Sequence, residues 1–311
     1  MLRCLWSALL MALLCGSGLR SDAADREATP PRLDKLTALN PQGTVFLDKP
    51  GRRLVLKGEV CLRDGLLEML VCLKRTKEHE AILSVDTKAQ IVHAGLLALG
   101  LEPGQPVKFQ PEYRPASGPV IDIVVSWQDD VGKSHRLDAR SLIRKSLRRY
   151  WVEKLETIPP GLQPPEDSEL RVDAKRNELL WYGPMSDAQR DNLLKLSADP
   201  GYQKAIGKFY QQTRVEELKA DWVFGGSGFF VDDKTGEKFY LAEEGNLICV
   251  ANFASATIDL EIPSTAANDE LLYEAFAERI PPVGTKVLIE LIPRTADKKP
   301  QTATDVPPEK K

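Results

Sequence analysis

Short apolar runs separated by turn dipeptides dominate the first third of this chain. Pro50-Gly51, Lys57-Gly58 and Asp64-Gly65 interrupt the apolar residues between positions 44 and 73, so that no run exceeds a few residues. Such runs are shorter than a stable helix and match β-strands joined by tight turns. The sequence therefore predicts a set of antiparallel strands in this region.

Capping signals predict helices between the strands. A Thr87-x-x-Gln90 capping box is expected to start a helix that ends at Gly100, and a Ser186-x-x-Gln189 box is expected to start another that reaches about Leu196. Asp199-Pro200 predicts a third helix, extending to about Lys219, because proline is favoured at the first helical position.

Two more helices are expected from weaker patterns. Asp138 can cap a basic helix over 139–152, and a last helix is expected over 268–278. The predicted fold class is α+β, with two mixed modules that each consist of an antiparallel sheet with helices packed on one face.

A proline-rich segment divides the predicted modules. Residues 158–168 contain four prolines, which exclude regular structure there. The expected organisation is a signal peptide (1–23), a flexible leader (24–40), a first module (41–157), the linker (158–168), a second module (169–293) and a disordered tail (294–311).

The two halves resemble each other weakly. Residues 64–108 can be laid over 244–288 without gaps, which aligns a few glycines and apolar residues and places His93 on Tyr273. A divergent duplication is one interpretation, and chance similarity of two strand-helix-strand units is the other.

The start of the chain predicts export. A short basic segment, an apolar run from Leu5 to Leu14 and small residues before Ala24 are typical of a cleaved signal peptide, which places the mature protein in the periplasm or outside the cell. Lipid anchoring at Cys15 is the alternative, although Leu14 is bulky for a lipoprotein signal. No later segment has the roughly 20 consecutive apolar residues of a membrane-spanning helix.

Cysteine and charge content exclude some classes of protein. Removing the signal leaves Cys61, Cys72 and Cys249, and the last two lie in apolar runs that favour buried free thiols. The net charge of −3, with acidic and basic residues interspersed, argues against a nucleic-acid binder.

The one concentration of candidate chemistry is the tract Lys77-Glu78-His79-Glu80 with His93. His79, Glu80 and His93 are ligand types for a divalent metal such as zinc, although strand alternation would turn His79 away from Glu80. As a ligand-binding or acid/base site, Lys77, Glu78, His79 and His93 are the candidates. Structural hydrogen bonding is the third interpretation. The spacing matches no metalloprotease signature, so catalytic residues stay unassigned.

Several longer motifs carry a family resemblance. Residues 68–83 and 93–100, with Leu180-Trp181-Tyr182-Gly183-Pro184-Met185 and Ala220-Asp221-Trp222-Val223-Phe224, resemble the YdjY-domain proteins, in particular exported members of planctomycete type. The resemblance implies no particular activity. Some members of that family have been described as iron–sulfur proteins, but three scattered cysteines argue against a cluster that normally needs four thiolates.

The sequence thus favours an exported YdjY-like binding or assembly module without established catalytic activity. The alternative is a periplasmic metal-binding protein or metal-dependent hydrolase centred on His79, Glu80 and His93. The bound partner, a protein or a small ligand, is not specified, nor are the cofactor and the oligomeric state. Whether the chain is an enzyme stays open.

Overall fold

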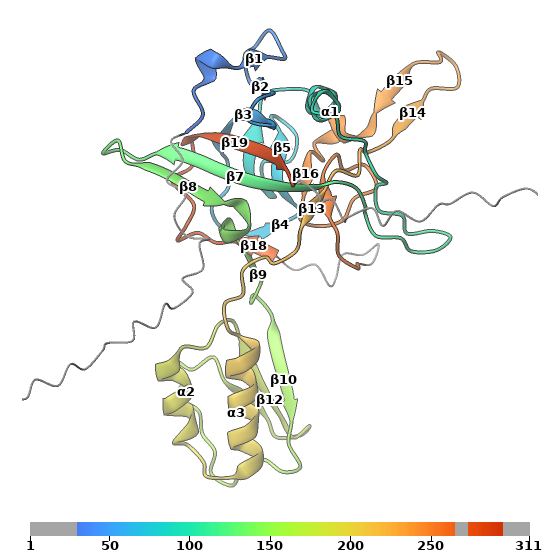
Figure 1. Cartoon of the computed structure of the whole chain (residues 1–311). Coiled ribbons are helices and arrows are strands. Elements are labelled where there is room, and N and C mark those ends of the chain that lie inside the picture. The colour runs from blue at the N-terminus through green and yellow to red at the C-terminus, as the bar shows by residue number, and fades with distance from the viewer. Residues whose placement is uncertain (1–29, 265–272, 295–311) are drawn as a thin grey trace, which may run out of the picture.

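The computed structural model describes residues 30–264 and 273–294, which form a large upper body and a smaller lower body (Figure 1). The helices are α1 (Ala89–Ala98), α2 (Asp187–Leu194) and α3 (Pro200–Gln212), with 3₁₀ turns η1 (Leu33–Lys35), η2 (Ala139–Leu142) and η3 (Leu241–Glu244). The strands are β1 (Thr37–Ala38), β2 (Val45–Asp48), β3 (Arg53–Val60), β4 (Leu66–Leu67), β5 (Met69–Leu73), β6 (Ala81–Val85), β7 (Val120–Gln128), β8 (Ser134–Asp138), β9 (Ile143–Lys145), β10 (Tyr150–Lys154), β11 (Arg171–Asp173), β12 (Glu178–Tyr182), β13 (Trp222–Val223), β14 (Phe229–Val231), β15 (Lys238–Tyr240), β16 (Ile248–Cys249), β17 (Asp259–Leu260), β18 (Tyr273–Ala275) and β19 (Lys286–Pro293). None of the helices within these ranges has the length and hydrophobicity needed to cross a bilayer.

The upper body is built on an 11-stranded mixed sheet. Its main path runs β16-β5-β6-β3-β19-β7-β13-β17, with β1, β2 and β8 attached at the sides. β5 and β6 are parallel, and the other paired strands of this sheet are antiparallel. The two ends of the path meet through a bridge between Ile248 and Ile258, so the sheet is nearly closed into a barrel.

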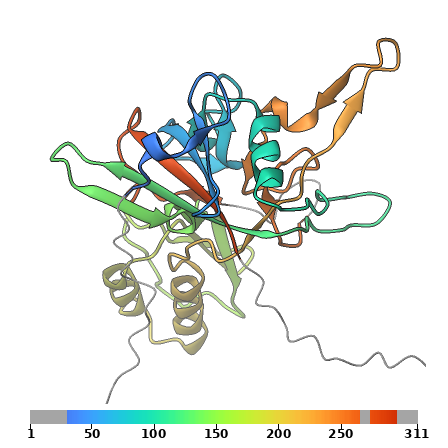
Figure 2. The ribbon, with the colours of Figure 1, turned by 45° about the horizontal axis from the view of Figure 1, so that its top comes forward.

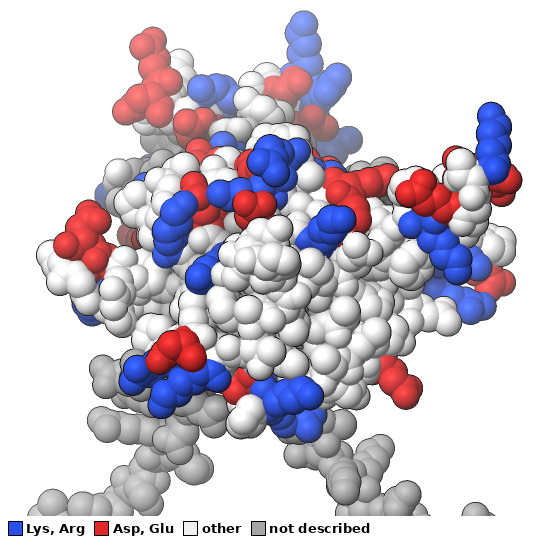
Figure 3. Space-filling model, turned by 90° about the horizontal axis from the view of Figure 1, so that it is seen from above, with Lys and Arg blue, Asp and Glu red and all other residues white. Residues whose placement is uncertain are grey.

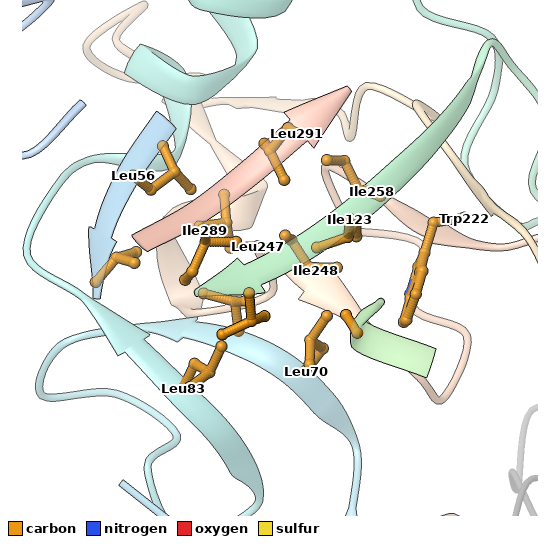
Figure 4. Close-up of a cluster of buried hydrophobic side chains, with 14 of the residues drawn as sticks. Leu56, Leu70, Leu83, Ile123, Trp222, Leu247, Ile248, Ile258, Ile289 and Leu291 are labelled. Atoms are coloured by element: carbon orange, nitrogen blue, oxygen red, sulfur yellow. The ribbon is translucent and has the colours of Figure 1, made fainter. Parts of the chain in front are cut away.

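Strands from both expected modules share this sheet. β19, near the C-terminal end of the described chain, lies between β3 and β7 and is antiparallel to both. Its alternate residues Val287, Ile289 and Leu291 are buried in the same core as Leu56 and Ile123 (Figure 4). β3 and β7 satisfy the backbone hydrogen bonds of β19 on both sides, while its apolar face packs into this core, so the two expected modules contribute to one sheet.

The lower body contains a three-stranded sheet, ordered β10-β12-β11, with α2 and α3. Its separate core includes Leu179 and Trp181 of β12 with Tyr202, Ile206 and Phe209 of α3. The proline-rich segment connects β10 to β11, and both of these strands pair with β12.

The two helices of the lower body begin where the sequence predicts. Ser186 and Gln189 make the reciprocal capping box of α2. Asp199 caps α3, with Pro200 in the first turn. Helix α3 ends at Gln212 instead of near Lys219, because the chain that follows it pairs with β9. Glu216 and Leu218 make backbone hydrogen bonds with that strand.

The expected Thr87 capping box is wrong. Lys88 is the N-cap of α1 and makes no side-chain cap, while the Thr87 hydroxyl accepts a hydrogen bond from Asn40. The carboxylate of Glu243 accepts the backbone N–H of Gln90 at 3.0 Å instead. A side chain distant in sequence thus caps α1.

The basic helix expected over 139–152 is also wrong. Asp138 does accept the N–H of Arg140, but the segment forms η2, β9 and the start of β10. Arg144 and Arg148 pair with the buried carboxylate of Glu274 in β18, and these pairs stabilise the extended chain.

The last predicted helix and the duplication are not confirmed. Residues 273–275 of that helix form β18, while 268–272 lie outside the described residues. His93 is helical and its aligned counterpart Tyr273 lies in a strand, so the two segments differ in structure. The cysteines agree with expectation: Cys72 and Cys249 are fully buried free thiols, and burial raises the pKa of Cys249 well above its ordinary value.

Candidate functional site

The His-Glu tract forms a turn between β5 and β6, not part of a strand. The His79 side chain is 77% exposed, and its Nε2 lies 3.7 Å from Oε2 of Glu80. The other carboxylate oxygen of Glu80 lies 3.1 Å from Nζ of Lys77. The turn therefore brings these neighbours together as a surface ion-pair group.

Local contacts account for the remaining charges of this turn. The Lys77 ammonium also lies 3.4 Å from Glu68 and 4.8 Å from the centre of the Phe253 ring. The Glu78 carboxylate accepts backbone N–H groups of Arg75 and Thr76. The side chains of Lys77 and Glu78 thus stabilise the turn.

His93 belongs to a different environment. Its Nδ1 lies 2.9 Å from the Tyr240 hydroxyl, and its ring meets the edges of Phe224 and Tyr240 at 5.0 and 5.4 Å between ring centres. Burial lowers the pKa of His93 below its ordinary value and raises that of Tyr240 to about 12. Burial therefore favours the neutral form of both side chains.

The hydrogen-bond directions around Tyr240 follow from its single hydroxyl hydrogen. The Gly226 carbonyl, 3.0 Å away, can only accept, so the hydroxyl donates to it. His93 Nδ1–H and the Thr257 hydroxyl then donate to the tyrosine oxygen. This network holds the base of the β14–β15 hairpin against α1, a role that no local sequence pattern indicates.

The proposed metal ligands are not assembled into one site. The contacts of His79 are with Glu80, whereas those of His93 are with Phe224 and Tyr240. Within residues 30–264 and 273–294, no group of three or more His, Cys, Asp or Glu side chains is arranged to hold a metal ion.

A cleft that the sequence did not indicate lies where β3, β7 and β19 run side by side. It has a volume of about 730 Å³. Apolar lining comes from Trp127, Pro281, Pro282 and Leu288, and Lys57 and Lys286 also line it. The strand register places Leu288 opposite both Lys57 and Ser126, so one row across the sheet carries all three.

Ser126 is the unusual residue of this cleft. It is 1% exposed, and its hydroxyl has no hydrogen-bond partner among the described residues. Most buried hydroxyl groups in folded proteins are hydrogen-bonded, because leaving one unpaired costs about 1–3 kcal/mol. The hydroxyl is itself buried, so a group bound in the cleft could supply the missing bond only after neighbouring side chains move.

The wall beside Trp127 is held by a stacked histidine that is hydrogen-bonded to a carboxylate. His135 stacks on the Trp127 ring, with 5.1 Å between ring centres and 10° between planes, and its Nε2 lies 2.8 Å from Asp129. This contact with His135 holds the pKa of the Asp129 carboxyl below its usual range. The tryptophan is therefore positioned before any ligand arrives.

Comparison with known proteins identifies one part of the chain. No curated protein and no solved structure matches it. The model of the YdjY domain matches residues 45–152, which extend from β2 into β10 and include the His-Glu turn, α1 and β7. The chain therefore carries a YdjY domain over residues 45–152.

Proposed function

We propose that this protein is an exported binding module that holds a small amphipathic ligand in the cleft between β3, β7 and β19. A cleft of about 730 Å³ with apolar walls and Lys57 in its lining is the observation that carries the proposal. Ligand pockets typically have about 300–1,000 Å³ and combine apolar walls with a few polar groups. This cleft has that size and composition.

Lys57 and Lys286 line the cleft together with Asp129 and Asp130, and Lys57 is the residue that would bind an anionic group of the ligand. Lys286 pairs with Glu59, whereas Lys57 lies over the Phe46 ring at 5.1 Å and makes no ion pair with a described carboxylate. The Lys57 ammonium is therefore free to attract an anion. The ligand class is an apolar or aromatic body with one acidic group.

The alternative function, metal binding or metal-dependent hydrolysis at His79, Glu80 and His93, receives less support. His79 lies in an exposed turn, and His93 is engaged with Tyr240.

The dye anilinonaphthalene sulfonate, which has an aromatic body and a sulfonate, tests the cleft. We expect the wild-type protein to bind it with a change in tryptophan fluorescence that Trp127→Phe removes. Lys57→Glu should weaken binding about tenfold, equivalent to about 1.4 kcal/mol. Lys175→Glu, in the exposed β11–β12 turn, is the matched control. Equal dye affinity of the two charge variants would overturn the assignment.

Export has a separate test, because residues 1–29 lie outside the described structure. We expect the protein recovered from the periplasm or the medium to begin at about Ala24, as intact-mass spectrometry would measure. A retained Met1, or a lipid on Cys15, would contradict cleavage after Ala23.

A further inference from the structure

The β14–β15 hairpin projects from the upper body, as Figures 1 and 2 both show. It is a separate two-stranded sheet. Phe229, Phe230, Val231 and Phe239 have exposed fractions between 45% and 60%. A two-stranded hairpin is marginally stable by itself in water, and clustered exposed apolar side chains mark interaction surfaces.

The base of the hairpin is fixed. Tyr240 bonds to Gly226 and Thr257 and meets His93, and the Phe229 ring packs on Tyr240 at 5.2 Å. The exposed aromatic side chains are thus presented by an anchored element.

The register shows which backbone groups of β14 are free. The bonds Leu241 N–H to Gly228 C=O and Asp232 N–H to Glu237 C=O lie on either side of the Phe230–Phe239 pair. Antiparallel bonding alternates along a strand, so Phe229 and Val231 direct their N–H and C=O groups away from β15. No strand in the described part of the chain pairs with this edge.

We propose that a second copy of this chain pairs with this edge, β14 to β14 and antiparallel, about a two-fold axis at Phe230. The two hairpins then form one four-stranded sheet. Phe229 of each copy exchanges both backbone bonds with Val231 of the other. The two Phe230 side chains lie opposite each other, and each already has Phe239 beside it, with 6.4 Å between ring centres. Four phenylalanine rings therefore form a row across one face.

Charge favours a second copy over a charged partner. No charged residue lies between Gly228 and Val231, and the pairing places Asp232 opposite Gly228 of the other copy, so like charges are not opposed. α1, at the base of the hairpin, also contains no Lys, Arg, Asp or Glu. The face seen from above, on which α1 lies, has a broad uncharged area (Figure 3).

The buried area is consistent with a reversible dimer. A buried aromatic side chain covers about 150–250 Å², so three half-exposed phenylalanines offer roughly 300 Å² per copy. A stable interface buries about 800 Å² per partner. The hairpins alone therefore form a small interface, and dimerisation is expected to be weak and to depend on concentration.

Sedimentation equilibrium of the mature protein tests the proposal. The mass should rise towards twice the monomer mass with concentration. Phe230→Lys and Val231→Pro should stay monomeric, because the first opposes two like charges and the second removes an outward N–H while leaving the bonds between β14 and β15 intact. Val131→Lys, at the tip of the exposed β7–β8 hairpin, should dimerise like the wild type.

Cysteine cross-linking tests the register. With oxidised glutathione as the oxidant, Phe230→Cys should form a covalent dimer as two thiols are oxidised and two glutathiones released, whereas Phe239→Cys, one strand further from the axis, and the wild type should not. A wild-type monomer at all concentrations would overturn the proposal, as would dimers that survive both edge substitutions. Monomers that co-sediment with phosphatidylcholine vesicles would instead assign the hairpin to a lipid surface. Dye binding in the cleft is independent of each outcome.

Discussion

Replacing Glu290 with glutamine is expected to destabilise the protein by about 3–5 kcal/mol. Glu290 is fully buried in the central strand β19. Nε of Arg136 lies 3.0 Å from one of its carboxylate oxygens, and Arg53 pairs with the other. The neutral amide would leave two guanidinium groups without this counter-charge and would turn an amide donor towards their donors.

Urea denaturation would measure this loss as a lower unfolding midpoint with an unchanged slope. Glu278→Gln is the matched control, because its side chain is 68% exposed and lies 3.6 Å from Arg144. Exposed ion pairs contribute about 0–1 kcal/mol, so the control should unfold close to the wild type. Similar midpoints for the two variants would show that the buried pairs contribute little.

Asp259 is expected to make the folded protein more stable in mild acid. It is fully buried, and burial raises its pKa to about 7, although Asn252 and the backbone N–H groups of Phe253 and Leu260 donate to it. The unfolded chain has an Asp pKa of about 3.9, so between these values the folded state binds more protons than the unfolded state. This contribution to stability is complete below about pH 4 and is lost as the pH rises to about 7, with a total of about 4 kcal/mol.

The difference in melting temperature between wild type and Asp259→Asn isolates this effect. Carboxyl groups with lowered pKa values, such as Asp221 beside Arg294, make the folded protein less stable as the pH falls. Their effect is the same in the wild type and the variant, so it cancels when the two melting temperatures are subtracted. The asparagine variant should become more stable relative to the wild type from pH 4 to pH 8. The exposed Asp167→Asn should show no such trend. A difference that does not change with pH would mean that Asp259 is ionised throughout.

Elements governed by neighbouring residues could be predicted from the sequence. The caps at Ser186 and Asp199 formed as expected, because each depends on side chains within a few positions. The resemblance to the YdjY domain likewise rests on contiguous motifs and is matched over residues 45–152. The burial of Cys72 and Cys249 could be predicted from the apolar residues beside them in the sequence.

Long-range contacts decided the elements that the sequence did not predict correctly. The 139–152 segment has helical caps and charges, yet its arginines pair with Glu274 from the end of the described chain, and it becomes extended. α1 takes its cap from Glu243, a residue distant in the sequence, while the Thr87 hydroxyl bonds to Asn40. Tertiary pairing of a buried charge outweighs the few tenths of a kcal/mol that separate local conformational preferences.

The candidate site shows the same division. His79 and Glu80 are neighbours in the sequence and remain neighbours in the turn, but His93 joins Tyr240, which the sequence does not connect to it. The cleft combines β3, β7 and β19 with Pro281 and Pro282. The sequence does not distinguish Ser126 from other strand serines, because its place in the cleft depends on the pairing of β7 with β19, which sets Leu288 beside it. The sequence by itself determined the starts of α2 and α3 and the short strands between positions 44 and 73, because these depend on neighbouring residues. Only the tertiary structure decided which strands meet, because strand alternation is a local property and register depends on the shared core.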